Sequence, residues 1–391
     1  MTPITTTDAL AEFCERLRGR PFVAVDTEFM RETTYWPKLC LVQAAAGDAA
    51  AVIDPLAPDL DLGPFLAVMT DTSIEKVFHA ARQDVEILNN LGAMPRPLFD
   101  TQVAAMAAGF PEQVAYDGLV RQMLSIEIDK SSRFTDWARR PLSDAQLTYA
   151  LGDVTHLAEL YPMLRAKLEA SGRLAWVREE MQALIDPALY DTEPENAWKR
   201  LKPRRHGAKY LAVLKAVAAW RERTAQTRDQ PRGRILKEDA IDELATQTPT
   251  DAEALGRLRS LAKGFAGSKF GVEVLEAVRE GLAAAEHHPV EPRKPPKPPS
   301  APTGAVVELL KVLLKARSED ANVASKLIAT VSDLEKIASD DEAETEALQG
   351  WRREVFGEDA LKLKRGEIAL VLDGSKVRAV EVRRRPRTAE D

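Results

Sequence analysis

Two carboxylates stand side by side at the end of an apolar segment near the start of the chain. Residues 21–25 predict a buried strand, and Asp26 and Glu28 follow it directly. Residues i and i+2 of a strand point to the same face, so the two carboxylates project together. Such a pair repels unless one member takes a proton or a divalent cation lies between them, and carboxylate oxygens suit Mg²⁺ or Mn²⁺. These residues alone leave open a metal site and an ordinary strand end that emerges into solvent.

Further polar residues follow at positions where the same metal site would need them. Asp84 lies in the first turn of a predicted helix, just after a strand that ends near His79. Tyr149 and Asp153 are four residues apart in a later helical segment, which places them on one helix face. There the carboxylate can hold a metal while the phenol orients a water. Singly, each residue has an ordinary structural explanation, such as an acid at a helix N-terminus. Their combined order and spacing favour one shared metal site.

Residues 1–175 alternate strand-like and helix-like segments, which predicts an α/β domain around a central sheet. We expect the first three strands to form a meander, because the segments between them are short. Strands are predicted at 21–29, 39–46, 49–55 and 75–80, and helices at 7–18, 81–92, 100–109 and 143–170.

The rest of the chain is mainly helical. Two helical blocks, 208–286 and about 305–356, flank a Pro-rich segment that has the composition of an extended linker. Both blocks have an amphipathic helix, a polar turn and a short apolar segment that opens another helix, which indicates a duplicated module. A β-hairpin turning at Asp373-Gly374 is expected after the second block.

The composition of the 391-residue chain is that of a globular protein, with 45% hydrophobic and 29% charged residues. No apolar run approaches the roughly 20 residues of a membrane-spanning helix. The N-terminal segment lacks a basic region followed by an apolar core, so we expect no signal peptide. Cys14 and Cys40 form no CxxC pair, which disfavours a zinc site and favours a reducing, cytoplasmic compartment.

Charge is distributed unevenly along the chain. The net charge is −7, yet residues 199–237 carry thirteen basic residues against two acids, a local charge of +11. Tyr210 and Trp220 are interleaved with these cations. The alternative is a solvated helix face, but so one-sided a charge favours a polyanion such as nucleic acid.

With these residues in view, the chain resembles the DEDD exonucleases of the tyrosine-containing branch and, within them, the ribonuclease D family. The matching stretches are "AVDTEF" (Asp26, Glu28), "FHAARQDVEIL" (Asp84) and "YALGDV" (Tyr149, Asp153). "TYWPKLCLVQ", "LFDTQ" and "DKSSRFTDWARRPLSDAQLTYA" are also similar to that family. The helical blocks resemble the HRDC domains that follow its nuclease domain, although the second block diverges more and its hairpin is not expected of an HRDC domain.

The resemblance implies a fold class and a domain organisation. It implies an α/β ribonuclease H-like (DnaQ-like) exonuclease domain followed by two all-α HRDC-like domains. The expected divisions are an exonuclease domain at 1–175, a connecting segment at 176–207, a first HRDC-like domain at 208–286, a Pro-rich linker at 287–304, a divergent second HRDC-like domain with its hairpin at 305–382, and a disordered tail at 383–391.

The activity implied by the resemblance is 3′→5′ exoribonucleolytic hydrolysis with two Mg²⁺ or Mn²⁺ ions. In this scheme Asp26 bridges both ions, Glu28 and Asp153 hold the ion that presents the water, Asp84 acts on the leaving-group side, and Tyr149 orients the water. The expected substrates are structured RNAs with single-stranded 3′ ends, above all tRNA precursor 3′ trailers, and the products are 5′-mononucleotides. A monomer is expected, with no membrane partner.

Several other residues are candidates for substrate binding or for purely structural roles. Asp100 is predicted to be a helix N-cap, Trp137 a packing residue, and His79 more often a core histidine than a ligand. The cations near Trp137, Arg140 among them, are expected to contact the RNA backbone or to pair with Asp129 and Asp136. The tentative substrate-binding residues are Gln43, His79, Lys130, Arg133, Arg204, Arg205 and Lys209.

Two rival functions stay open. A DNA 3′→5′ exonuclease would use the same metal site, since only contacts to the 2′-hydroxyl distinguish RNA from DNA. A non-catalytic RNA-binding protein would use the helical blocks and keep the first domain as a relic, although the complete set of carboxylates disfavours this.

Overall fold

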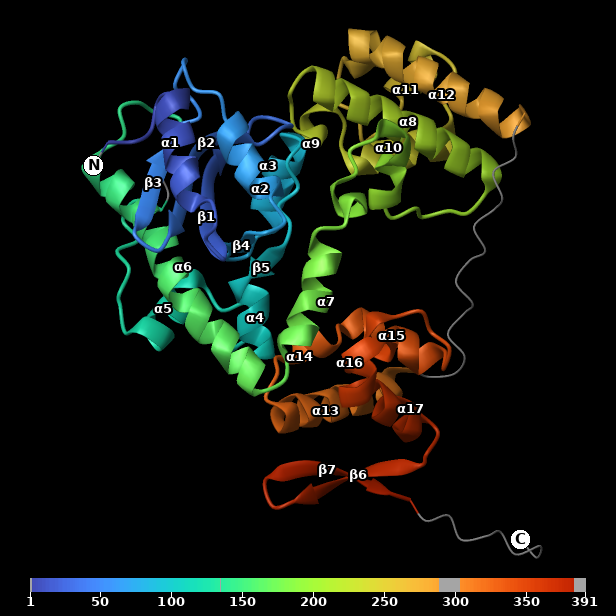
Figure 1. Ribbon diagram of the computed structural model, residues 1–391. Coiled ribbons are helices and arrows are strands. Elements are labelled where there is room, and N and C mark those ends of the chain that lie inside the picture. Colours follow the sequence, from blue (N-terminus) through green and yellow to red (C-terminus); the bar gives the residue numbers. More distant parts are fainter. Residues whose placement is uncertain (1, 134, 288–302, 383–391) are drawn as a thin grey trace, which may run out of the picture.

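The computed structural model describes residues 2–133, 135–287 and 303–382, and three bodies are visible in it (Figure 1). The first is a sheet with its helices, the second a helical domain from α8 to α12, and the third a helical domain from α13 to α17 that ends in a hairpin. The Pro-rich segment and the C-terminal tail predicted from the sequence fall almost wholly outside the described residues.

A five-stranded mixed sheet forms the centre of the first domain, in the order β3-β2-β1-β4-β5. The pairs β1–β2 and β2–β3 are antiparallel, which confirms the predicted meander, whereas β4 and β5 extend the sheet in parallel with β1. Strand β1 is therefore the central strand of the sheet, paired with β2 on one side and β4 on the other. The strands are β1 (Phe22–Met30), β2 (Lys38–Ala46), β3 (Ala49–Ile53), β4 (Glu75–Phe78) and β5 (Leu98–Asp100).

Helices cover both faces of this sheet. Helix α6 packs along β1, β2 and β3, and α1 contacts β3 and α2. A capping box fixes the start of α6, since the Ser143 and Gln146 side chains each accept a backbone N–H of the other residue. The helices of this domain are α1 (Thr7–Leu17), α2 (Gly63–Thr70), α3 (Arg82–Asn90), α4 (Thr101–Ala107), α5 (Tyr116–Leu124) and α6 (Asp144–Ala170). The next helix, α7 (Leu174–Leu184), packs against α4, β5 and α6 of this domain.

The first helical domain has its own apolar core. Its longest helices, α8 and α12, pack against each other, and the short 3₁₀ helix η2 (Pro194–Arg200) packs on α8. Tyr210 and Trp220 are buried in this core. The helices are α8 (Ala208–Thr227), α9 (Arg232–Ile235), α10 (Glu238–Gln247), α11 (Ala252–Gly256) and α12 (Lys269–His287).

The second helical domain repeats the opening order of the first: a long helix, a four-residue helix and a medium helix. Its last helical stretch contains a π-helical turn, Arg353–Gly357, between two short α-helices. The predicted hairpin is present and turns at Gly374, so this prediction is confirmed. The elements are α13 (Thr303–Ala321), α14 (Ser325–Ile328), α15 (Val331–Ser339), α16 (Gly350–Arg352), α17 (Glu358–Lys364), β6 (Ile368–Asp373) and β7 (Lys376–Glu381).

Helix α7 joins the second helical domain to the sheet domain (Figure 1). Trp176 of α7 stacks on Trp351 with ring centroids 4.4 Å apart, and Arg352 pairs with Glu180 at 2.5 Å. The Ala324 N–H also donates to the Met106 carbonyl at 3.0 Å. Within the described residues, no helix combines the length and the apolar character needed to cross a membrane.

Candidate active site

The sheet places two of the predicted carboxylates on one of its faces. Asp26 lies opposite Gln43 and Glu28 opposite Leu41 in the β1–β2 register, so these side chains share the face that α6 covers. Thr27, between the two acids, points to the other face. The alternation of one strand thus brings Asp26 and Glu28 together, as the sequence predicts.

Helix α6 supplies a third carboxylate to this face. One oxygen each of Asp26, Glu28 and Asp153 lies within 4.8 Å of the other two, which makes this the metal-ligand cluster found among the described residues. Tyr149 lies one helical turn before Asp153 and lowers the pKa of its carboxyl through a hydrogen bond. Residues from two distant segments therefore converge on a single point, as their spacing predicts.

A tyrosine that the sequence did not single out fixes this turn of α6. The hydroxyl of Tyr116, on α5, donates to the backbone carbonyl of Asp153 at 2.6 Å and lies 3.3 Å from that of Gly152. Tyr116 is therefore hydrogen-bonded to the backbone of Asp153, the residue whose side chain is a candidate metal ligand. No local sequence pattern predicts this hydrogen bond, because it joins residues that are 37 positions apart in the chain.

The electrostatics of the cluster are those of crowded, buried acids. Burial and then the charge of Asp153 raise the pKa of Asp26 to about 8. Burial and then Asp26 raise the pKa of Glu28 to about 9. Burial raises the pKa of Asp153 to about 7, against the opposing effects of Tyr149 and Arg133. Three carboxyls with raised pKa values form a site whose negative charge a divalent cation would compensate.

Asp84 approaches the cluster from α3 but has a separate partner. Its side chain is buried, and its Oδ1 accepts a hydrogen bond from the Thr27 hydroxyl at 2.5 Å. Burial and then the charge of Asp26 raise its pKa well above the ordinary value. Asp84 therefore feels the charge of Asp26 while lying outside the group formed with Glu28 and Asp153.

A cleft of about 780 Å³ opens over the four acids. His79, Lys130 and Arg133, predicted as substrate-binding, also line it. Sequence reasoning missed further polar side chains that face this space, because nothing in their local pattern separates them from surface residues. These are Gln83, Gln102, Gln113, Tyr116 and Asp117.

His79 is held within the domain even though it lines the cleft. Its Nδ1 lies 3.0 Å from the Thr101 hydroxyl and its Nε2 lies 3.1 Å from the Val114 carbonyl. Burial lowers the pKa of His79. Asp100 caps α4 by accepting from the Gln102 N–H at 2.8 Å, as predicted. These contacts favour the structural interpretation of this segment, with His79 as a bonded core histidine.

Gln43 is fully buried between β1 and β3, so it does not reach a substrate in this structure. This burial favours a structural place in the sheet over a contact with the 3′ nucleotide. Neither its amide oxygen nor its amide nitrogen has a hydrogen-bond partner among the described residues. A buried polar group in this state is costly and requires an explanation.

The segment before α6 is held by an arginine whose partner differs from the predicted ones. Arg140 makes a bidentate pair with Asp54, with both N–O distances 2.7 Å, and not with Asp129 or Asp136. It also donates to the Trp137 carbonyl at 2.7 Å. Trp137 is buried, as predicted, and stacks on the Tyr149 ring with 6.2 Å between the ring centroids.

Lys130, another cation of this segment, pairs with Asp117 at 2.5 Å, and both residues line the cleft.

Several arginines of the basic stretch 199–237 are paired with acids or buried, so fewer of them can contact a polyanion than the composition suggests. Arg200 and Arg232 pair with Glu222, Arg204 pairs with Asp239 at 2.6 Å, and Arg221 is buried. The interleaved aromatics, Tyr210 and Trp220, are largely buried in the core of this domain, which does not favour the predicted role of both rings in binding a polyanion. Arg205 and Lys209 are exposed and stay candidates for contact with a polyanion.

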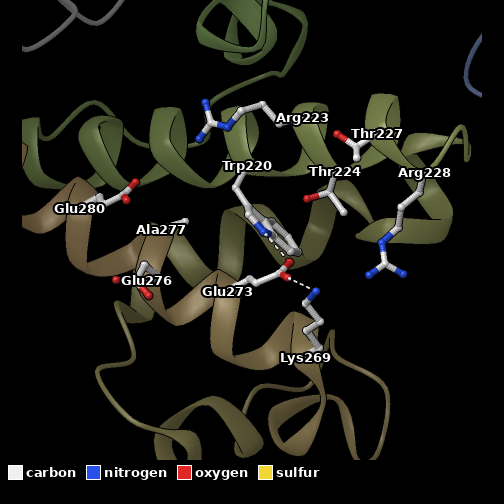
Figure 2. A pocket seen from close by; sticks show the side chains of 10 residues that line it. All are labelled: Trp220, Arg223, Thr224, Thr227, Arg228, Lys269, Glu273, Glu276, Ala277 and Glu280. Carbon is white, nitrogen blue, oxygen red and sulfur yellow. Dashed lines mark hydrogen bonds and ion pairs between the residues drawn. The ribbon is translucent and has the colours of Figure 1, made fainter.

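A second hollow, of about 390 Å³, lies between α8 and α12 (Figure 2). Its lining includes Arg223 of α8, Arg228 just after α8, and acids of α12. Glu273 accepts a hydrogen bond from Trp220 at 3.3 Å and lies 3.7 Å from Lys269 (Figure 2). Because three acids and three bases line it together, the hollow does not favour a polyanion.

Comparison with known proteins links this geometry to a family of nucleases. Residues 1–169 match the model of the 3′-5′ exonuclease family, and residues 210–278 match that of the HRDC domain. The chain is similar to Ribonuclease D of Nitrobacter hamburgensis, with 52% identity over 97% of this chain and 100% of that protein. It is 50% identical to Ribonuclease D of Granulibacter bethesdensis, over 97% of this chain and 96% of that one.

A solved structure agrees with these sequence matches. The crystal structure of Escherichia coli RNase D, an exoribonuclease involved in structured RNA processing, superposes with a TM-score of 0.79 at 30% identity. The match covers 93% of this chain and 99% of that one. The similarity therefore extends over the sheet domain and the helical domains together.

Proposed function

The chain belongs to the ribonuclease D family and is a 3′→5′ exoribonuclease, and on this basis we propose that Asp26, Glu28, Asp84, Tyr149 and Asp153 are its catalytic residues. The observation that carries the proposal is the convergence of Asp26, Glu28 and Asp153 within 4.8 Å. Their three carboxylates come from two segments more than 100 residues apart and meet at the floor of a cleft. A structural role does not require three partly buried acids to share one point.

The family uses divalent metal, and the residues present fit such an ion. The donor set consists of carboxylate oxygens, which suit Mg²⁺ and Mn²⁺, and raised pKa values mark a site that lacks compensating charge. We propose that two such ions bind, held by Asp26, Glu28, Asp153 and Asp84. When bound, ions of this kind stabilise the attacking and leaving oxygens of phosphodiester hydrolysis.

Tyr149 orients the water that attacks the terminal phosphodiester. Burial, followed by the charges of Asp153 and Glu28, raises the pKa of its hydroxyl further above the ordinary value. Tyr149 therefore keeps its proton at neutral pH and acts as a hydrogen-bonding phenol, not as a phenolate base. Trp137, stacked on its ring, holds the phenol over the carboxylates.

The cleft provides cations for the phosphates of the 3′-terminal nucleotides. Arg133 lowers the pKa values of Glu28 and Asp153, so its charge acts at the cluster itself. Lys130 lies in the same cleft. We assign both residues to the substrate backbone, and Arg205 and Lys209 to more distant phosphates. Arg204, paired with Asp239, contributes less.

We propose that the substrates are structured RNAs with single-stranded 3′ ends, with tRNA precursor 3′ trailers the leading class, and that 5′-mononucleotides are released. The similarity to Escherichia coli RNase D, an exoribonuclease involved in structured RNA processing, supports this choice. We place the enzyme in the cytoplasm as a monomer, consistent with two free, buried cysteines.

The HRDC domain model matches residues 210–278. The order of helix lengths supports a second domain of this kind further along the chain. We assign 1–175 to the exonuclease domain, 208–286 to the first HRDC-like domain and 305–382 to a divergent second copy with its hairpin. In support, the long, four-residue and medium helices of α8–α10 recur in α13–α15.

The test of this proposal compares RNA with DNA. A 5′-labelled RNA with a single-stranded 3′ tail, a DNA of the same sequence, and an RNA with one 3′-terminal 2′-deoxynucleotide are incubated with the full chain and Mg²⁺. Stepwise shortening of the RNA, with little shortening of the DNA, supports the exoribonuclease assignment. Equal shortening of both would make the chain a general 3′→5′ exonuclease.

A further inference from the structure

The loop that follows the catalytic strand belongs, by packing, to the first helical domain. Residues 31–37 join β1, which carries Asp26 and Glu28, to β2. Tyr35 in this loop is 9% exposed and lies in the apolar core of the first helical domain, with Trp36 packed against that core. A segment seven residues beyond Glu28 is thus built into the neighbouring domain.

The Tyr35 hydroxyl is at the centre of a hydrogen-bond network. It donates to Glu222 Oε1 at 2.5 Å and accepts from Gln226 Nε2 at 3.1 Å and Arg232 Nη2 at 2.9 Å. The Arg232 guanidinium also lies over the Tyr35 ring, 4.6 Å from its centroid. The helical domain therefore contacts the Tyr35 side chain in three ways: it accepts the hydroxyl proton, donates to the hydroxyl oxygen and covers the ring face.

The acceptor of the Tyr35 hydroxyl, Glu222, is a buried carboxylate whose charge is balanced by two arginines. Its side chain is fully buried and pairs with Arg200 at 2.7 Å and with Arg232 at 2.6 Å. A buried charge needs such partners, and removing one of them is costly. The contact is therefore a part of the domain core rather than a passing surface encounter.

The backbone of the loop is held as well. The N–H groups of Tyr35 and Trp36 both donate to Asp229 Oδ1, at 3.0 and 2.9 Å. Asp229 follows the C-terminus of α8 with a φ of +46°, in the left-handed region that aspartate tolerates better than most residues. One carboxylate oxygen thus anchors two consecutive amides of the loop.

Strand β1 itself does not depend on this contact. Its residues pair with β2 on one side and β4 on the other, and Arg31 at the start of the loop pairs with Glu86 of α3 at 3.2 Å. Loss of the contact would free the helical domain, which stays attached through α7 and η2, while the carboxylates keep their places.

We propose that Tyr35 and Asp229 are positioning residues that fix the first helical domain relative to the catalytic strand. RNA long enough to touch both domains is thereby held in register with the carboxylates. A dinucleotide, which fills only the cleft, does not need them. The proposal rests on the proposed function and predicts that this contact favours longer RNA over a dinucleotide, since two binding surfaces reinforce each other only when their geometry is fixed.

The variants are chosen to break the contact without strain. Asp229→Gly removes the carboxylate and keeps the left-handed backbone, which glycine adopts freely. Asp229→Asn keeps an oxygen acceptor and is the conservative rescue. Tyr35→Phe removes the hydroxyl and keeps the ring. Tyr210→Phe is the matched control, because Tyr210 is buried in the same helical domain and donates to a carboxylate, Asp242, at 2.6 Å, without reaching the sheet domain.

The measurement is kcat and KM of the full chain with Mg²⁺ on a dinucleotide and on an RNA with a single-stranded 3′ tail. We expect Tyr35→Phe combined with Asp229→Gly to lower kcat/KM on the tailed RNA at least about tenfold, through KM. The dinucleotide kinetics stay unchanged, and Tyr210→Phe and Asp229→Asn behave like the wild type on both substrates.

An equal loss on both substrates, or a loss on neither, would overturn the positioning role. A wild-type chain that shortens neither substrate would instead overturn the proposed function, so the two failures are distinguishable.

Discussion

Thr27 donates a 2.5 Å hydrogen bond to Oδ1 of Asp84, which lines the same cleft as Asp26, Glu28 and Asp153. Thr27 stands between the two acids of β1, so one three-residue stretch contacts or carries three of the four acids of the cleft. Its outer residues carry carboxylates toward α6, and its central residue holds the acid that arrives on α3.

Replacing Thr27 by valine tests this link. The substitution keeps the shape of the side chain and leaves the buried Asp84 carboxyl without its donor. We expect the free energy of unfolding to fall by about 1–3 kcal/mol, the cost of an unsatisfied buried polar group, and kcat to fall because Asp84 is no longer held. Urea unfolding and single-turnover kinetics measure the two effects. Unchanged stability would show that the hydrogen bond contributes nothing.

The raised pKa values of Asp26, Glu28 and Asp153 predict how stability without metal depends on pH. Their folded-state values of about 7 to 9 lie above those of an unfolded chain. Between about pH 4 and about pH 9 the folded chain holds more protons than the unfolded chain, so the free energy of unfolding falls as pH rises. The slope is about 1.4 kcal/mol per pH unit for each carboxyl that stays protonated.

Divalent metal should reverse this trend, because it replaces the protons. We expect the rise in Tm on adding Mg²⁺ to be larger at about pH 9 than at about pH 5. Asp26→Asn should flatten the pH dependence and reduce the metal effect. Thermal unfolding in EDTA and in Mg²⁺ across this range is the measurement, and a metal effect that is the same at both pH values would contradict the account.

Gln43→Met should stabilise the protein. Both polar atoms of the Gln43 amide are buried without a partner among the described residues, and methionine has a similar shape with no polar group to satisfy. We expect a gain of about 1 kcal/mol in the free energy of unfolding, with kcat and KM on RNA unchanged. A loss of stability would mean that the amide has a partner, such as a buried water, that its surroundings do not reveal.

Arg140→Lys should disturb Tyr149 through Trp137. Lysine keeps the positive charge but lacks the planar fork that holds both oxygens of Asp54 and the Trp137 carbonyl. We expect a loss of about 1.5–3 kcal/mol of unfolding free energy and a lower kcat with little change in KM. Arg139→Lys, at the neighbouring exposed position, is the matched control. If kcat stays at the wild-type value, the Trp137–Tyr149 stack does not position the phenol.

Much of the sheet domain could be predicted from the sequence, because its signals are local. Apolar runs marked β1 to β4, and the short spacing of the first three strands predicted their antiparallel meander. The family resemblance, confirmed by the comparisons, gave the ribonuclease H-like and HRDC classes. The five predicted catalytic residues all line one cleft, since strand alternation and helical periodicity decide which side chains share a face.

Contacts between distant segments of the chain could not be predicted from the sequence. The hydrogen bond from Tyr116 to the Asp153 carbonyl, the pairing of Arg140 with Asp54 and the burial of Tyr35 in another domain each depend on tertiary packing. The basic stretch is the clearest case. Its charge predicts a surface for a polyanion, but Glu222, Asp239 and the domain core engage several of its arginines.

The central claim is that the carboxylates on β1 and α6 hold metal for exonucleolytic cleavage. The most direct test follows a 5′-labelled RNA with a single-stranded 3′ tail in Mg²⁺, in EDTA, and with Asp26→Asn and Asp153→Asn. Metal-dependent shortening from the 3′ end, lost in EDTA and in both variants while each variant remains folded by circular dichroism, is the predicted result. Shortening that persists in either folded variant, or in EDTA, would contradict the account.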